Sequence, residues 1–423
     1  MTTLFPLSLP KKIRRTATVL ILLSASVSAM AQRHIIYADD VASLTVTAGD
    51  DWLSLPVTQL GGEPIHIGFD VFTHERRRYT YKLEHCEADW SASTQLLTSD
   101  FVAGFAEGNT IEDGEESLNT NVLYTHYSLQ LPNSKCAFTR SGNYKLTVCD
   151  DDNNGEPVLT ACFMVTEPLM GVSMQATTNT DIDVNVTHQQ VGLTVNYGGL
   201  RVTNPQEQLK TVVLQNGRWD DARVNAKPQF VMADGLRWDH CRNFIFDAGN
   251  EYRKFEMLDV DHTTMGLETL HWDGNNYHAY VWTDEPRPNY VFANDANGAF
   301  LIRNSDNTEI DYTCDYLLTH FRLKSPRQNG RVFLNGAWTY DSFLPQYEMQ
   351  WNDSSKCYEA TVRLKQGYYS YQYLLVDSQG QAVHLPSEGN FYQTENTYQA
   401  LVYYREQGGR SDRLVGYASV RIK

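Results

Sequence analysis

One short stretch of the chain carries acidic and amide side chains at the spacing of a calcium loop. Residues 150–155 read Asp-Asp-Asp-Asn-Asn-Gly and match the pattern D-x-[DN]-x-[DN]-G. In that pattern alternate oxygens converge on one hard cation, and the glycine permits the sharp turn. The twelfth position, where a bidentate glutamate completes the loop, is Ala161. A polar hairpin tip is therefore the favoured interpretation, and we expect no metal and no other cofactor.

Other signals of catalysis are missing from the sequence. There is no nucleophile elbow, no HExxH motif, no P-loop and no dinucleotide fingerprint. The 12 histidines never fall at helical metal-ligand spacing, and pairs of acids are uninformative in a chain that has 51 Asp and Glu residues. We predict a protein that is not an enzyme and has no catalytic residue. One alternative hypothesis is an enzyme whose active site is assembled from carboxylates that lie far apart in the sequence.

Aromatic residues near the C-terminus follow a pattern of their own. Val332, Leu334 and Gly336 alternate and are followed by Trp338, and three tyrosines alternate within residues 367–373. This region resembles the early-set β-sandwich of glycogen- and starch-binding modules. The resemblance makes Trp338 and Trp351 candidates for a platform that stacks on sugar rings, whereas aromatic side chains at such spacing more often pack in a core.

The seven cysteines are widely spaced and form no CxxC pair. A bridge between Cys149 and Cys162 would join the two arms of a predicted hairpin. The alternative, which we favour, is that the cysteines are small buried hydrophobic residues, because cysteine is among the most buried residue types.

The elements that must position these residues are almost all strands. Alternation with period two is clear over residues 144–148, 277–282 and 367–373. Turn dipeptides such as Asn216-Gly217 and Asn297-Gly298 recur between them and supply the positive φ of tight hairpins. Regular strands with regular turns indicate an all-β fold of tandem immunoglobulin-like or early-set β-sandwich domains.

The chain is long enough for several such domains. We expect an N-terminal β-sandwich over residues 32–168, a second β-sandwich over residues 169–312 and an early-set-like C-terminal β-sandwich over residues 313–423. Without a low-complexity linker, these domains are expected to pack together or to form a stiffly jointed rod.

The first 31 residues have the features of a signal peptide. Four basic residues precede an apolar run over residues 16–27, and residues 29–31 (Ala-Met-Ala) suit signal peptidase. The mature chain would begin at Gln32, with no nearby cysteine for lipid attachment. Removing residues 1–31 changes the formal net charge from −16 to −20. Such a charge favours a soluble protein and disfavours nucleic acid or anionic lipid as a partner.

A series of short motifs runs in order through most of the mature chain. The motifs are residues 85–90 (HCEADW), 104–105, 119–120, 124–127 (YTHY), 131–133, 141–144, 212–216 with Trp219, Pro228, Asn243, residues 251–255, 284–285 and 414–417 (LVGY). Taken together, this series is similar to the type IX secretion system plug proteins of Bacteroidetes. The resemblance implies a periplasmic protein that associates with the inner face of the outer membrane. Its partner would be the periplasmic mouth of the translocon barrel, which it would seal while no substrate is exported.

The resemblance implies protein contacts and no active site, and it assigns no contact residue. Residues 76–78 (three arginines), 219–221 (Trp-Asp-Asp) and 286–288 (Pro-Arg-Pro) are candidate contact loops because arginine and tryptophan are common interface hot spots. For each of them we favour the alternative, a solvated turn or a structural bend. We expect a monomer when free, without membrane insertion. The competing function is a periplasmic carbohydrate-binding protein that uses the C-terminal module.

Overall fold

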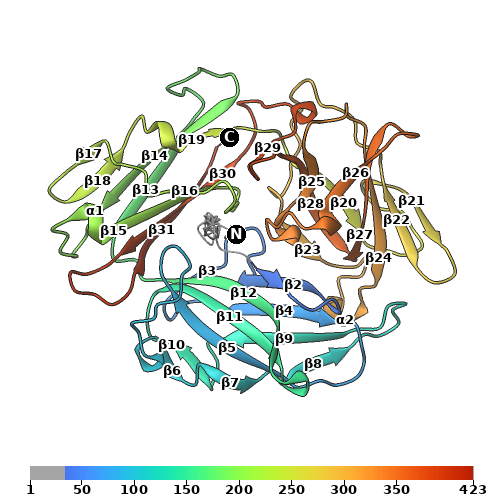
Figure 1. Ribbon diagram of the computed structural model, residues 1–423, viewed down its shortest axis with the longest axis horizontal. Helices are drawn as coiled ribbons and strands as arrows, with labels where there is room; N and C mark the ends of the chain where they lie inside the picture. Colours follow the sequence, from blue (N-terminus) through green and yellow to red (C-terminus); the bar gives the residue numbers. More distant parts are fainter. Residues whose placement is uncertain (1–33, 423) are drawn as a thin grey trace, which may run out of the picture.

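The computed structural model describes residues 34–422 and shows three β-rich lobes arranged around a common centre (Figure 1). The predicted signal peptide, residues 1–31, lies outside the described residues. Strands dominate the fold, as predicted, and the two α-helices of the described chain, α1 (Pro205–Gln208) and α2 (Ile310–Thr313), have one turn each. No helix within residues 34–422 is long and apolar enough to cross a membrane.

The first domain is a β-sandwich built from the N-terminal strands. One sheet has the order β1-β12-β11-β5-β7 with β3 on β12, the other has the order β2-β4-β9-β8, and β10 pairs with β6. The strands are β1 (Ile35–Ile36), β2 (Val41–Ala48), β3 (Val57–Gln59), β4 (Ile65–Val71), β5 (Tyr79–Cys86), β6 (Val102–Gly104), β7 (Glu107–Thr110), β8 (Asp113–Glu116), β9 (Thr125–Leu131), β10 (Cys136–Phe138), β11 (Gly142–Asp150) and β12 (Glu156–Thr166).

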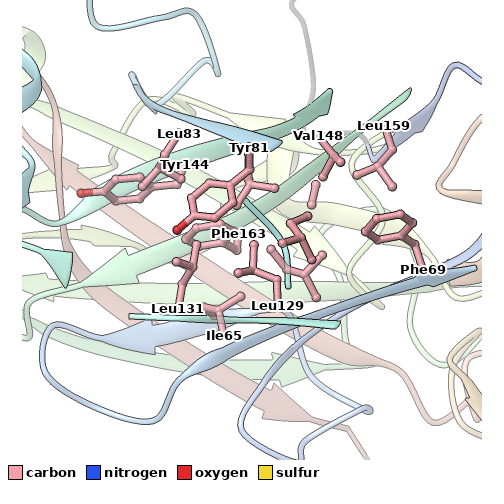
Figure 2. Close-up of a cluster of buried hydrophobic side chains, with 14 of the residues drawn as sticks. Ile65, Phe69, Tyr81, Leu83, Leu129, Leu131, Tyr144, Val148, Leu159 and Phe163 are labelled. Atoms are coloured by element: carbon pink, nitrogen blue, oxygen red, sulfur yellow. The ribbon is translucent and has the colours of Figure 1, made fainter. Parts of the chain in front are cut away.

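Alternating side chains of both sheets fill this sandwich (Figure 2). Tyr144 and Val148 point inward from β11 because strand side chains alternate between the two faces. The Tyr144 ring stacks on Phe163 of β12 at 5.6 Å between centroids, and Ile65 and Leu129 close the core from the other sheet.

The second domain takes strands from two distant parts of the chain. One sheet has the order β13-β14-β18-β17 with β19 on β14, and the other has the order β16-β15-β30-β31. The strands are β13 (Gly171–Thr177), β14 (His188–Asn196), β15 (Leu209–Gln215), β16 (Arg223–Val224), β17 (Phe230–Val231), β18 (Gly235–Trp238), β19 (Ile245–Asp247), β30 (Thr397–Tyr404) and β31 (Arg413–Arg421).

The third domain is inserted between β19 and β30. Its strands pair in the order β20-β28-β25-β26-β27-β24-β22-β21, and β23 and β29 also pair with β28. The strands are β20 (Arg253–Met257), β21 (Leu267–Trp272), β22 (Tyr277–Val281), β23 (Phe300–Ile302), β24 (Tyr316–Leu323), β25 (Arg331–Asn335), β26 (Glu348–Asn352), β27 (Cys357–Lys365), β28 (Gly367–Val376) and β29 (Ala382–His384).

This pairing divides the chain differently from the expected domains at residues 169–312 and 313–423. Strand β20 pairs with β28, although they were expected in different domains, and the C-terminal β30 pairs with β15 of the second domain. Local periodicity identifies strands but says nothing about which distant strand completes a sheet. The early-set-like region therefore includes residues from β20 onward and ends before β30.

The seven cysteines all lie in the described part of the chain, and no two of them form a disulfide bond there. Cys149 faces Pro157 and Cys162 faces Lys145 in the β11–β12 register, so these two cysteines are not cross-strand neighbours. Six of the seven are buried and Cys149 is half-buried, which agrees with the interpretation of cysteine as a small hydrophobic residue.

Candidate functional site

The carboxylates of the acidic loop at residues 150–155 accept hydrogen bonds from their own turn and from the start of the neighbouring strand β5. Asp150 caps the turn by accepting a 3.0 Å hydrogen bond from the N–H of Asp152. Asp151 accepts from the Thr80 hydroxyl at 2.9 Å, and Asp152 accepts from the N–H of Arg78 at 2.8 Å. Within residues 34–422 no group of three or more His, Cys, Asp or Glu side chains is arranged to hold a metal. The loop is therefore a hairpin tip whose carboxylates fasten it to the start of β5.

The candidate sugar-stacking platform is not formed at Trp338. This side chain is 4% exposed, lies in the core of the third domain and donates from Nε1 to the carbonyl of Ser370 at 3.1 Å. Trp351 is half-buried against Tyr358, with ring centroids 5.1 Å apart. The turn after β25 directs the Trp338 ring between Phe321 and Tyr347, which agrees with the favoured interpretation that these aromatic residues pack in a core.

The three loops proposed as contacts mainly serve the fold. Arg77 pairs with Asp40 at 2.8 Å, and Arg78 pairs with Asp151 at 3.3 Å. Arg287 donates to the Glu251 carbonyl and to Glu388, both at 2.6 Å.

Trp219 is 5% exposed, so it is not an exposed contact residue, and the favoured interpretation of its loop as a structural one fits. It packs edge-to-face on Trp90 of the first domain, with ring centroids 5.6 Å apart. The two tryptophans thus join two domains.

Around this tryptophan pair lies an apolar cluster that joins the first and second domains. Its other buried members are Cys86, Ala88, Cys162 and Met164 from the first domain and Val212, Leu214, Leu401, Tyr403 and Leu414 from the second. Strand β15 is buried on both faces, since Val213 packs in the core of its own domain while Val212 and Leu214 face the first domain. Burying these apolar side chains stabilises the contact between the two domains by about 25 cal/mol for each Å² of apolar surface removed from water.

Charged groups surround the same contact. Glu87 of the first domain accepts hydrogen bonds from Arg405 at 2.5 Å and from the N–H of Asp412 at 2.7 Å. Asp412 in turn accepts from the N–H of Ala88 at 3.0 Å and from Lys210 at 2.7 Å. Burial alone would raise the pKa of Asp412, but these donors hold that pKa below its usual value, so the carboxylate stays ionised.

A buried ion pair joins the first and third domains. The Asp70 side chain on β4 is fully buried and accepts three hydrogen bonds of 2.6 Å, from His126 Nδ1, the Tyr316 hydroxyl and Lys365 Nζ. Burial alone would raise the pKa of Asp70, but Lys365 and His126 hold it below its usual value. Lys365 Nζ also lies 4.2 Å from the centre of the Tyr124 ring. Removing one partner of such a pair leaves an uncompensated buried charge, so separating the two domains here costs several kcal/mol, on the order of 3–5.

The contact between the second and third domains is polar. Asp341 accepts from the N–H of Trp219 at 3.3 Å, and Gln189 donates to the carbonyls of Tyr392 and Thr394, both at 2.8 Å. All three domains are thus fixed to one another by buried groups. We call these contacts the three joints.

The joints contain several of the motif residues found in the sequence. Glu87 and Trp90 come from residues 85–90, His126 comes from residues 124–127, and Leu414 comes from residues 414–417. The sequence analysis did not identify Asp70, which binds His126, or Lys365, which binds Asp70. Asp70 and Lys365 are 295 positions apart, and no local pattern links them.

Exposed apolar side chains gather on loops that border the second and third domains. Ile182, Val184 and Val186 lie between β13 and β14 and are 53%, 61% and 56% exposed, while Val291 and Phe292 are 74% and 57% exposed. The first loop is the green one at the top of Figure 1.

Two contacts bring these loops together. The N–H of Tyr392 donates to the carbonyl of Val186 at 3.2 Å, and the adjacent Phe391 ring lies 6.1 Å from that of Tyr290. We call Ile182, Val184, Val186, Val291 and Phe292 the apolar rim. Exposed apolar groups gathered in this way are typical of a surface that contacts another protein.

The described chain is a three-domain, all-β protein whose domains are joined by buried contacts and which exposes apolar side chains on loops at the border of the second and third domains. Residues 41–167 match the family model of the Type 9 secretion system plug protein 1st domain. The crystal structure of a hypothetical protein from Parabacteroides merdae ATCC 43184 is similar over 92% of this chain and 99% of that chain, with 37% sequence identity and a TM-score of 0.89. No curated protein is similar enough to count as a match.

The chain belongs to the type IX secretion plug family, as the sequence predicted. Its role is related to type IX secretion, in a family of non-catalytic components that associate with the secretion machinery.

Proposed function

We propose that this protein is a non-enzymatic periplasmic plug that binds the periplasmic mouth of the type IX translocon barrel and seals it while no substrate is exported. The match of residues 41–167 to the plug family supports this proposal most strongly. The physical properties of the molecule agree with it. A seal must resist deformation, and the three joints give the body that stiffness.

The proposal includes export through residues 1–31 and a periplasmic location against the inner face of the outer membrane. It also assigns the apolar rim to the contact with the barrel. Interfaces of this kind have an apolar centre and a polar border. The rim has polar groups beside it, including the Asp183–His188 pair at 2.7 Å.

Affinity purification of the tagged protein from its own envelope in mild detergent tests the main proposal. We expect a very large outer-membrane barrel protein in the eluate, identified by mass spectrometry. An eluate that contains no outer-membrane barrel protein would overturn the plug proposal.

A pair of matched double variants tests the rim. Val184→Ser with Phe292→Ser should reduce recovery of the barrel about tenfold or more, because a few central apolar residues carry most interface energy. Leu97→Ser with Phe105→Ser is the control, since these side chains are 68% and 71% exposed in the first domain. Equal loss in both variants would remove the rim from the interface without affecting the plug proposal itself.

A further inference from the structure

A cavity of about 550 Å³ lies where the three domains meet. It falls within the usual size range of small-ligand sites, roughly 300–1,000 Å³. Its walls come from β2 and residues 49–56 of the first domain, residues 216–218, 397, 399 and 421 of the second, and residues 295–302 and 335–341 of the third. Asp50 and Leu53 are exposed to solvent, so the cavity is accessible from outside. The lining segments surround the middle of Figure 1.

The lysine and the two arginines of the cavity wall are already paired with carboxylates. Arg218 pairs with Asp220 at 2.7 Å, Lys365 pairs with Asp70 at 2.6 Å, and Arg421 pairs with Glu395 at 2.9 Å. These permanently charged groups therefore do little to attract an anion into the cavity.

Within residues 34–422, three carboxylates of the wall, Asp50, Asp295 and Asp341, form no ion pair within 4.0 Å with a lysine, arginine or histidine. Asp341 already accepts hydrogen bonds from the N–H of Trp219 at 3.3 Å and from Asn335 Nδ2 at 3.1 Å. Since Asp50 is exposed, Asp295 is the more enclosed of the other two. It accepts hydrogen bonds from the N–H of Tyr252 and, at 2.7 Å, from the N–H of Asn297. A carboxylate can accept about four hydrogen bonds, so part of its capacity remains for a ligand.

The surroundings of Asp295 disfavour its negative charge until a cation arrives. Burial, with a smaller contribution from the charge of Glu251, raises the pKa of Asp295 to about 7, although the backbone donors of Asn297 and Tyr252 and the charge of Arg421 lower it. A bound cation would remove this penalty, because an opposite charge within about 4–6 Å favours the ionised form.

Aromatic rings stand beside this carboxylate. Trp52 lines the cavity and packs edge-to-face on Tyr368, with ring centroids 6.0 Å apart. After burial, the Asp295 carboxylate is the next cause that raises the pKa of Tyr368, to about 12, which shows that the two groups are close. A carboxylate next to aromatic faces is the chemistry that selects ammonium and guanidinium groups.

We propose that the central cavity binds an ammonium or guanidinium group on a flexible chain, held between Asp295 and Trp52. Two sources carry this chemistry: a lysine or arginine side chain of a partner segment, and a free polyamine. The site is distinct from the apolar rim and does not depend on the translocon contact. It gives the plug a ligand-sensitive point where all three domains touch.

Isothermal titration calorimetry on the purified mature chain, residues 32–423, tests the proposal at pH 8. The probes are spermidine and the capped peptide Ac-Gly-Lys-Arg-Gly-NH2, with Ac-Gly-Gln-Gln-Gly-NH2 as the uncharged control. We expect saturable 1:1 binding of a basic probe and none of the control peptide. Binding of spermidine alone assigns a free polyamine, whereas binding of the basic peptide assigns a protein segment.

Three variants locate the bound group. Asp295→Asn should weaken binding at least tenfold, and Trp52→Leu should weaken it about fivefold, which also covers the case in which Asp295→Asn fails to fold. Asp113→Asn is the control because it removes one exposed carboxylate in the first domain and changes the net charge equally. The proposal is overturned if neither basic probe binds, or if Asp113→Asn weakens binding as much as the two cavity variants. Loss of barrel recovery with intact probe binding would overturn only the plug proposal.

Discussion

At the scale of single residues, the most demanding contact is the buried pair of Asp70 and Lys365. Both side chains are no more than 2% exposed, and they come from different domains. We predict that Lys365→Met lowers the free energy of unfolding by about 3–5 kcal/mol, since removing one partner leaves Asp70 charged and buried. Urea denaturation followed by tryptophan fluorescence measures this change.

The double variant Asp70→Asn with Lys365→Met is the matched control for that prediction. It removes the buried charge together with its partner, so it should recover part of the loss and show a coupling of about 1–3 kcal/mol. Additive losses from the two single substitutions would show that the pair is not coupled.

The Asp295 carboxyl group makes the stability of the protein depend on pH. Burial, with a smaller contribution from the charge of Glu251, raises the pKa of Asp295 from its ordinary value of 3.8 to about 7 in the folded protein. The folded state therefore holds a proton that the unfolded state has lost between pH 4 and 7. Stability contributed by this group falls as pH rises through that range.

We predict that the wild type loses roughly 2 kcal/mol more stability between pH 5 and pH 8 than Asp295→Asn does. The other charged groups around Asp295, including Glu251, Glu395 and Arg421, are present in both proteins and cancel in this comparison. Chemical denaturation at the two pH values measures the difference. Asp113→Asn should keep the wild-type slope, and an unchanged slope in Asp295→Asn would contradict the assignment.

At the scale of elements, the C-terminal hairpin β30–β31 completes the second domain. Strand β15 pairs with β30 along its whole length, from Leu209 with Tyr404 to Gln215 with Tyr398. Gly249 and Thr394 are also close, since the Thr394 hydroxyl donates to the Gly249 carbonyl at 3.0 Å. A short linker can therefore replace the inserted third domain.

We predict that residues 169–250 joined to residues 394–422 fold as an independent domain, whereas residues 169–312 do not. The second fragment leaves β15 without its neighbour and exposes an apolar face. Dispersed amide signals in a proton–nitrogen correlation spectrum identify the folded fragment. Folding of residues 169–312 alone would instead support the boundary expected from the sequence.

The sequence predicted the strands well and their partners poorly. Residues 144–148 lie inside β11, and residues 367–373 lie inside β28, because alternation and turn dipeptides are local properties. The pairing of β15 with β30 depends on contacts about 190 residues apart, which no local pattern records.

The same limit applied to the candidate contact residues. Tryptophan is a residue type common at interface hot spots, so Trp219 was a candidate contact residue. It is instead buried against Trp90, because the first and second domains pack together at this point. The central cavity is formed by residues of three domains, so no single segment of the sequence could reveal it.

At the scale of the whole molecule, the joints decide whether the three domains behave as one body. An apolar cluster links the first and second domains, a buried ion pair links the first and third, and hydrogen bonds between side chains and main chain link the second and third. A loosely linked set of domains would bend under load and would leave gaps in a seal. The proposed function therefore requires that the domains unfold together and keep fixed relative positions.

This requirement gives a calorimetric prediction based on two leucines of equal chemistry. Leu214 faces the joint between the first and second domains, whereas Leu193 on β14 lies in the core of the second domain. Both are at most 1% exposed, so each change to alanine should cost about 2–5 kcal/mol.

The wild type should show a single unfolding transition, since the joints couple the domains. Leu193→Ala should lower that transition without splitting it, because the coupling is intact. Leu214→Ala should separate the first domain into its own transition, because the loss falls on the contact and not on either core. If Leu214→Ala and Leu193→Ala give the same single transition, the apolar cluster does not act as a joint, and rigidity must come from the ion pairs alone.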